Sequence, residues 1–76
     1  MISNSGENPA NEALALEKIS IDRKVFFLAL QENARGRFLR ITEEVGGRRD
    51  TIMVPAEAFR DFSEALERLI SIEKDL

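Results

Sequence analysis

The residues best suited to chemistry lie in one short stretch, residues 32–41, which reads Glu-Asn-Ala-Arg-Gly-Arg-Phe-Leu-Arg-Ile. Asn33 and Gly36 tolerate a positive φ, so the stretch predicts a tight hairpin connection between two strands. Arginines and one aromatic ring then gather at the turn and on the strand that leaves it: Arg35, Arg37, Phe38 and Arg40. This combination suits a nucleic-acid backbone with a stacked base. The alternative is a basic hairpin on the surface of a soluble domain.

Catalytic chemistry finds little support in the remaining residues. The chain has neither histidine nor cysteine, so the usual pairs of nucleophile and base cannot form and a thiolate metal site is excluded. Glu43 and Glu44 are neighbours on a predicted strand and face opposite ways, and no glycine-rich phosphate-binding motif is present. We therefore expect no enzyme, no cofactor, no metal and no small-molecule substrate.

The length and composition indicate one small domain. The chain has 76 residues, and domains of this size bury a low fraction of their surface and are only marginally stable alone. Without disulfides, such a domain needs a very good core or a second copy of itself. No apolar run approaches the ~20 residues of a membrane span, and the N-terminus lacks the pattern of a secretory signal. We expect a cytoplasmic protein that has no membrane partner.

The charge is segregated along the chain. The formal net charge is −3, which by itself argues against a nucleic-acid partner. However, the two ends are acidic and the middle of the chain is basic, with Arg23, Lys24, Arg35, Arg37, Arg40, Arg48 and Arg49. A segregated field of this kind can bind a polyanion on one face.

The elements that must position these residues follow from hydrophobic periodicity. Residues 1–12 are polar and predict a disordered leader, and residues 13–76 form the folded unit, although residues 13–16 are ambiguous and could begin a helical turn. Alternation predicts strands over 17–21, 24–32, 37–45 and 51–54, with Gly46-Gly47 as the second hairpin turn. Apolar residues at three- and four-residue spacings predict a helix over 56–72. The expected fold is therefore α+β, a four-stranded antiparallel sheet followed by one helix.

The second predicted strand is apolar on both faces, with Phe26, Leu28 and Leu30 on one and Val25, Phe27 and Ala29 on the other. One helix can cover only one face of a sheet, so a second protomer is the economical cover for the other. We also expect Phe59 and Phe62 of the helix to pack inward. In the third strand, Phe38 and Arg40 point away from Leu39 and Ile41, which we expect to face the helix-covered core.

The order of elements and the central motif resemble the PUR domain of the purine-rich-element-binding (Pur-alpha) proteins. The matching residues are Lys24 with Phe26-Phe27-Leu28, then residues 32–41, Thr51-Ile52, Val54-Pro55-Ala56, and the helix pattern Phe59-Arg60-Asp61-Phe62 with Ala65-Leu66 and Leu69-Ile70. The resemblance implies a ββββα repeat, two of which intertwine into one PUR domain. A chain with one repeat is similar to the short bacterial members, which form homodimers.

The resemblance also implies single-stranded DNA or RNA as the partner, with a preference for purine-rich sequences and a regulatory role in transcription or translation. We expect nucleic-acid contacts from Arg23, Lys24, Phe27, Gln31, Asn33, Arg35, Arg37, Phe38, Arg40 and Arg49. Of these, the resemblance places Asn33, Arg35 and the stacking ring Phe38 in the family's hairpin motif, and Lys24 in the polar triplet after the first strand. Gln31 stands where the family often has a lysine, and Asp22 stands where it usually has an amide, so both departures weaken the match. The alternative is a structural or protein-interaction dimer that has kept the fold and lost nucleic-acid binding.

Overall fold

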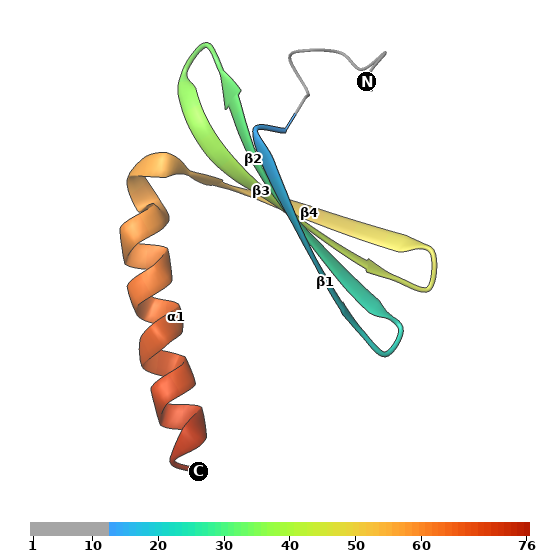
Figure 1. Cartoon of the computed structure of the whole chain (residues 1–76), viewed down its shortest axis with the longest axis vertical. Helices are drawn as coiled ribbons and strands as arrows, with labels where there is room; N and C mark the ends of the chain where they lie inside the picture. The colour runs from blue at the N-terminus through green and yellow to red at the C-terminus, as the bar shows by residue number, and fades with distance from the viewer. Residues whose placement is uncertain (1–12) are drawn as a thin grey trace.

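The computed structural model describes residues 13–76 and shows an antiparallel meander followed by a helix (Figure 1). The strands are β1 (Ala15–Ile21), β2 (Lys24–Asn33), β3 (Gly36–Val45) and β4 (Arg48–Pro55), and they lie side by side in the order β1-β2-β3-β4. A short 3₁₀ turn, η2 (Ala56–Ala58), leads into α1 (Phe59–Lys74). The predicted α+β class and ββββα order are confirmed. The predicted leader, residues 1–12, lies outside the described residues.

The strands run further than the hydrophobic alternation predicted. The ambiguous residues before position 17 do not form a helical turn: β1 begins at Ala15, and the Leu14 N–H donates to the Leu30 carbonyl at 2.7 Å. β4 begins at Arg48 because Gly46 and Gly47 both have a positive φ, 55° and 85°. This is the turn geometry that matches the twist of paired strands, and it brings Arg48 directly opposite Val45. Backbone hydrogen bonds therefore extend the strands into polar residues at their ends, which hydrophobic periodicity alone cannot assign to a strand.

The strand register divides the side chains between two faces of the sheet. Residues paired across strands share a face, and the faces alternate along each strand. One face, which we call the apolar face, consists mainly of Ile19, Ile21, Phe26, Leu28, Leu30, Leu39, Ile41, Ile52 and Val54. The other, which we call the basic face, carries Lys18, Phe27, Gln31, Phe38, Arg40, Thr42, Glu44, Arg49, Thr51 and Met53. Phe38 thus lies on the opposite face from Leu39 and Ile41, as expected.

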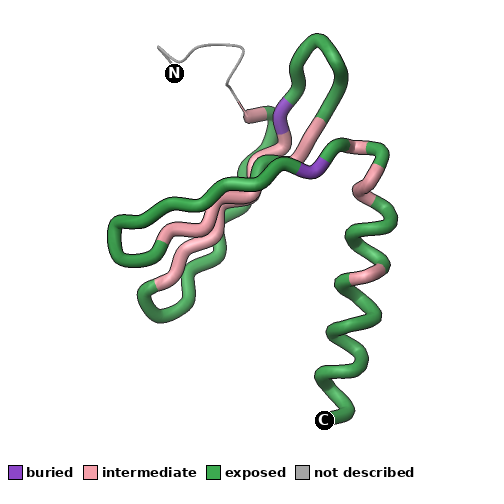
Figure 2. The backbone as a smooth tube through the Cα atoms, turned by 180° about the vertical axis from the view of Figure 1, so that it is seen from behind, coloured by how far each residue is buried: buried purple, intermediate pink, exposed green. Residues whose placement is uncertain are grey.

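The helix does not pack on the sheet of its own chain. It leaves the end of β4 and projects away from the strands (Figure 1), and almost its whole length is exposed (Figure 2). The prediction that Phe59 and Phe62 pack inward is wrong within this chain, since Phe59 is only half-buried and Phe62 is 44% exposed. The helix-covered core predicted around Leu39 and Ile41 is likewise absent, because no element of the described chain lies over them closely enough to bury them.

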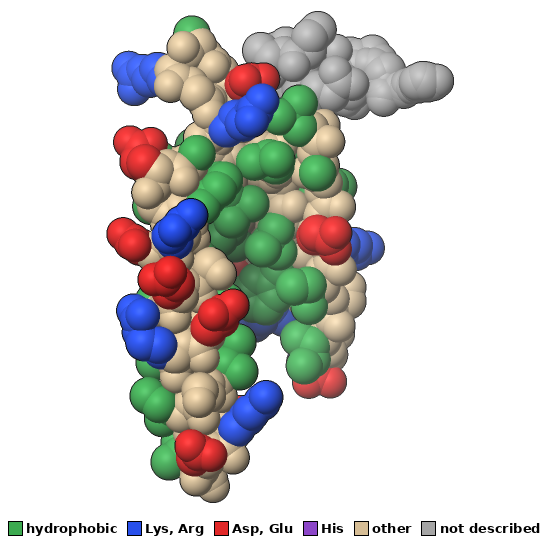
Figure 3. Space-filling view, turned by 60° about the vertical axis from the view of Figure 1, so that its left-hand side comes forward, with side chains coloured by type: hydrophobic (Ala, Val, Ile, Leu, Met, Phe, Trp, Pro, Cys, Tyr) green, Lys and Arg blue, Asp and Glu red, His purple; other side chains and the backbone are tan. Residues whose placement is uncertain are grey.

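A conventional core is missing as a result. Among residues 13–76, Val54 is the only buried hydrophobic residue, at 8% exposure. Hydrophobic side chains instead gather openly over the sheet beside the helix, while charged side chains follow the outer side of the helix (Figure 3). No helix of the described part of the chain is both long and apolar enough to cross a membrane.

Candidate nucleic-acid interface

The tip of the β2–β3 hairpin is built by a side-chain hydrogen bond and a glycine. The Arg35 backbone N–H donates to Asn33 Oδ1 at 2.8 Å, and Gly36 has a φ of 134°. Asn33 itself does not adopt a positive φ; its side chain closes the turn instead, as asparagine commonly does. This bond occupies the amide oxygen and leaves the Nδ2 hydrogens of the exposed Asn33 side chain pointing to other acceptors. Asn33 can therefore still donate to a base edge through Nδ2.

An open cleft of about 340 Å³ lies beside this tip. It is lined by the hairpin residues Asn33, Arg35, Gly36, Arg37 and Phe38 and, from the end of β4 and the turn after it, by Met53, Pro55 and Glu57. Phe38 is half-buried here, between the hairpin and the end of β4. The cleft thus offers an aromatic ring, an amide donor and two guanidinium groups within one concave surface, which suits a flipped-out base next to its phosphate.

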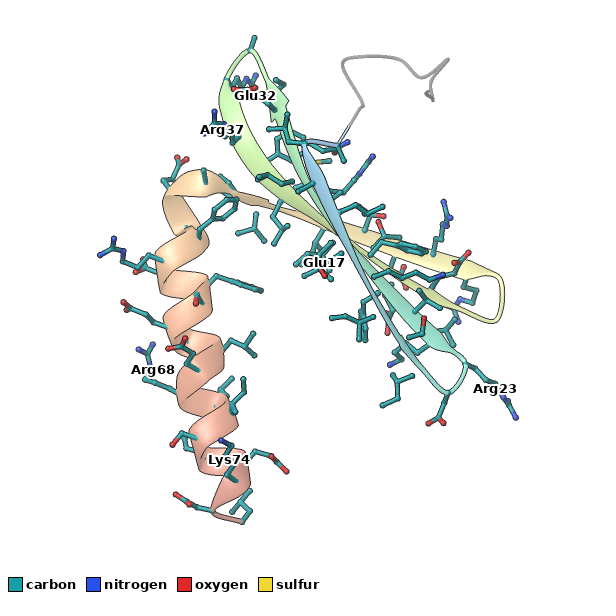
Figure 4. All side chains as sticks on the ribbon, viewed as in Figure 1. Glu17, Arg23, Glu32, Arg37, Arg68 and Lys74 are labelled. Carbon is teal, nitrogen blue, oxygen red and sulfur yellow. The ribbon has the colours of Figure 1, made fainter. Side chains whose placement is uncertain are left out.

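Ion pairs within the chain neutralise some of the predicted contact residues. Arg37 Nε lies 3.5 Å from Glu32 Oε2, and Arg49 Nε lies 3.4 Å from Glu44 Oε2. Lys24 Nζ lies 3.0 Å from Glu43 Oε2 and 5.7 Å from the centre of the Phe26 ring. All three pairs join residues on the same sheet face of adjacent strands, and Figure 4 shows Glu32 and Arg37 together near the hairpin tip. A phosphate must compete with these carboxylates, although exposed pairs of this kind contribute only about 0–1 kcal/mol.

Arg35 and Arg40 differ from these cations. Both side chains are exposed, and within residues 13–76 no ion pair involves either of them. Arg40 follows Phe38 by two residues on β3, so it lies next to that ring on the basic face. These two arginines are therefore the residues of the hairpin and β3 whose charge is most available to a phosphate.

Gln31, one of the predicted contact residues, is buried in the single chain. Its side chain is only 5% exposed, and it lies opposite Phe38 in the register of β2 and β3. Buried amides of this kind are held by interactions inside the protein. The contact between Gln31 and nucleic acid therefore stays a prediction, and it requires the side chain to leave this buried position.

The predicted site residues do not form a single cluster. Arg23 lies in the β1–β2 turn, far from the hairpin tip (Figure 4), and Lys24 is the first residue of β2. There, with Ile21, Asp22 and Val45, they line a separate open cleft of about 750 Å³. Asp22 occupies the left-handed region at φ 54°, which aspartate tolerates better than most residues. A single strand of nucleic acid that contacts both the hairpin tip and the β1–β2 end must therefore run along the length of the sheet.

Sequence reasoning did not include Lys18 among the functional residues. Lys18 Nζ lies 5.8 Å from the centre of the Phe27 ring, its register partner on β2. The alternation of β1 already placed Lys18 away from Ile19 and Ile21, which is a usable signal. Only the register, however, shows that it shares a face with Phe27, Phe38 and Arg40.

Comparison with known protein families places the chain next to nucleic-acid-binding proteins. The model of the family described as PurA ssDNA and RNA-binding protein matches residues 2–74. The chain is 34% identical over 73 residues to transcription factor Pur-alpha 1 of Arabidopsis thaliana, covering 91% of this chain and 25% of that protein. It is 34% identical over 82 residues to purine-rich element-binding protein gamma of Homo sapiens, covering 91% of this chain and 24% of that protein.

A further relative is the human transcriptional activator protein Pur-alpha, which is 32% identical over 71 residues, covering 84% of this chain and 22% of that protein. The chain therefore spans about a quarter of the length of the curated relatives it matches. The names of these relatives describe regulators and element-binding proteins, and none describes an enzyme.

Proposed function

This chain belongs to the PurA family of single-stranded DNA and RNA-binding proteins, and from that premise we propose that it binds single-stranded, purine-rich DNA or RNA as a homodimer. The proposed role is regulation of transcription or translation in the cytoplasm. The names of two relatives, a transcription factor and a transcriptional activator, support the transcriptional part of this role. The hairpin of the described chain supports the binding of nucleic acid. Its uncovered apolar surfaces support the homodimer.

The observation that carries the binding proposal is the arrangement around Phe38. Its half-buried ring borders the cleft at the hairpin tip, and the exposed Arg35 and Arg40 lie on either side of it along the chain. An aromatic platform beside cations binds successive bases and phosphates with little need for sequence-specific hydrogen bonds. In this proposal Phe38 stacks on a base, Asn33 donates to a base edge, and Arg35 and Arg40 bind phosphates.

The dimer proposal follows from the exposed apolar side chains. On α1, Phe62, Leu66, Leu69 and Ile70 are 44%, 51%, 63% and 45% exposed, and on the apolar face Ile19 and Ile52 are 52% and 56% exposed. Exposed apolar patches of this extent mark interaction surfaces. The helix of one protomer covering the apolar face of a second buries both patches at once, which also agrees with the pairing of repeats implied by the family resemblance.

Fluorescence polarisation with a labelled purine-rich strand of about a dozen nucleotides tests the binding proposal. We expect saturable binding of single-stranded DNA or RNA that weakens as salt rises, because phosphates release counterions on binding. A pyrimidine strand of equal length serves as the specificity control. Binding weaker than about 10⁻⁴ M at physiological salt, the loose end of non-specific affinity, contradicts the proposal.

That negative result would favour the second candidate, a protein-interaction dimer without nucleic-acid binding. The observation in its favour is that Glu32, Glu43 and Glu44 neutralise Arg37, Lys24 and Arg49. The two functions share the dimer and differ in strand affinity, so the titration separates them.

A further inference from the structure

The strand β1 carries a cation, Lys18, that is not among the residues of the proposed binding site. Lys18 Nζ lies 5.8 Å from the centre of the Phe27 ring, within the distance at which a cation is attracted to an aromatic face. Within residues 13–76 no ion pair involves Lys18. Lys18 is exposed and Phe27 is half-buried, so the ring forms a floor beneath a lysine whose charge is open to solvent.

Lys18 lies on the same face of the sheet as Phe38. Phe27 pairs with Lys18 on one side and with Thr42 on the other, and Phe38, Arg40 and Thr42 are successive basic-face residues of β3. A diagonal line from Phe38 across Arg40 to Lys18 spans on the order of 16 Å, given ~3.3 Å per residue and ~4.8 Å between strands. This length corresponds to about five stacked nucleotides at ~3.4 Å each.

The charges of the two sheet faces favour a path for the nucleic-acid strand from Phe38 to Lys18 over a path across the apolar face. On the basic face the strands carry Lys18, Arg40 and Arg49 against the single acid Glu44. On the apolar side acids outnumber bases, with Glu17, Glu32, Glu43 and Asp50 against Lys24, Arg37 and Arg48. Because a polyanion follows the positive potential, a strand anchored at Phe38 continues over the basic face.

We propose that Lys18, held above the Phe27 ring, is a further phosphate-binding subsite for the same nucleic-acid strand whose base stacks on Phe38. The proposal rests on the proposed function and extends it from the hairpin tip across β3 and β2 to the edge strand β1. Phe27 acts here as a positioning residue: its ring holds the ammonium group upright, and that group binds the phosphate. This differs from a role in which Phe27 itself stacks on a base, because Lys18 already lies over the ring.

The test compares Lys18→Gln with the parent on strands of two lengths. On a purine-rich 12-mer, we expect the slope of log affinity against log salt to fall by about 0.7, the value for one phosphate contact with a single strand. On a trimer, which reaches only the hairpin cleft, the variant and the parent should bind alike. Lys74→Gln, the same change at the end of α1, is the matched control and should alter neither slope, whereas Lys18→Arg should retain the parent slope on the 12-mer.

A second measurement uses the unaltered protein and so does not depend on how a variant folds. Lysine acetylation followed by mass spectrometry should show Lys18 protected by the bound 12-mer and Lys74 unprotected. This inference is overturned if the salt slope of Lys18→Gln equals that of the parent, or if Lys18 is acetylated equally with and without the 12-mer. In either case the proposed function still stands as long as the parent binds the strand. Failure of the parent to bind either strand overturns both.

Discussion

At the scale of single residues, Phe38 is where stability and binding can be separated. Its ring lies on the basic face beside the hairpin cleft, opposite to Leu39 and Ile41. We expect Phe38→Ala to weaken single-strand affinity by about 1–3 kcal/mol, the range for base–aromatic stacking, while the melting temperature stays within a few degrees of the parent. Polarisation titration and thermal melting of the same sample measure both quantities, with Phe38→Trp as the variant that keeps a stacking ring. A large loss of stability, about 3–5 kcal/mol, with unchanged strand affinity would show that Phe38 is a packing residue.

The two arginines that flank Gly36 should respond differently to substitution. Arg35 has no ion pair within residues 13–76, whereas Arg37 lies 3.5 Å from Glu32. We expect Arg35→Gln to lower the salt slope of strand binding by about 0.7, the single-strand value per phosphate. Arg37→Gln should lower it less, because its guanidinium is already partly neutralised. The salt dependence of affinity, measured for both variants on one strand, checks the order, and an equal or reversed order would contradict this account of the hairpin charges.

At the scale of elements, the β3–β4 hairpin depends on the backbone conformation of its glycines. Gly47 has a φ of 85°, and a Cβ atom built there meets nothing within 4 Å. Gly47→Ala should therefore destabilise only through the left-handed backbone, by about 1–2 kcal/mol, and not through a clash. Gly47→Asn is the control, since asparagine tolerates this region better. Denaturant unfolding at one fixed protein concentration measures the difference, and equal stability of the alanine variant and the parent would refute the conformational explanation.

At the scale of the whole molecule, α1 is a helix whose apolar stripe does not pack on the described sheet of its own chain. Leu69 on this stripe is 63% exposed. We expect Leu69→Glu to convert the proposed dimer into a poorly folded chain with the monomer mass of 8.6 kDa, because the charge cannot be buried without a partner. Light scattering after size exclusion measures the mass.

The matched control for this change is Arg68→Glu, which places the same side chain on the outer side of the helix. Arg68 points away from the sheet (Figure 4), so this variant should retain the dimer mass. The melting temperature of the parent should also rise with protein concentration if folding and association are coupled. A parent mass near 8.6 kDa at all micromolar concentrations would contradict the dimer.

The sequence by itself determined the elements and their order. Alternation identifies β2 and β3, the Gly46-Gly47 pair identifies a turn, and three- and four-residue spacing identifies α1, since each of these signals is local and needs no knowledge of the rest of the chain. The same alternation separated Phe38 from Leu39 and Ile41. The residues 32–41 also carried the family resemblance, which the match to the PurA family confirms.

Only the tertiary structure decided which of these residues lie together and which are available. The strand register, a non-local property, brings Lys18 over Phe27, Glu32 to Arg37 and Gln31 into a buried position. The expectation that α1 covers the sheet of its own chain was wrong because the packing of a helix is also a non-local property. Hydrophobic periodicity shows that a helix face must be buried, but it does not show against which surface, and here the described chain leaves both α1 and the apolar face uncovered.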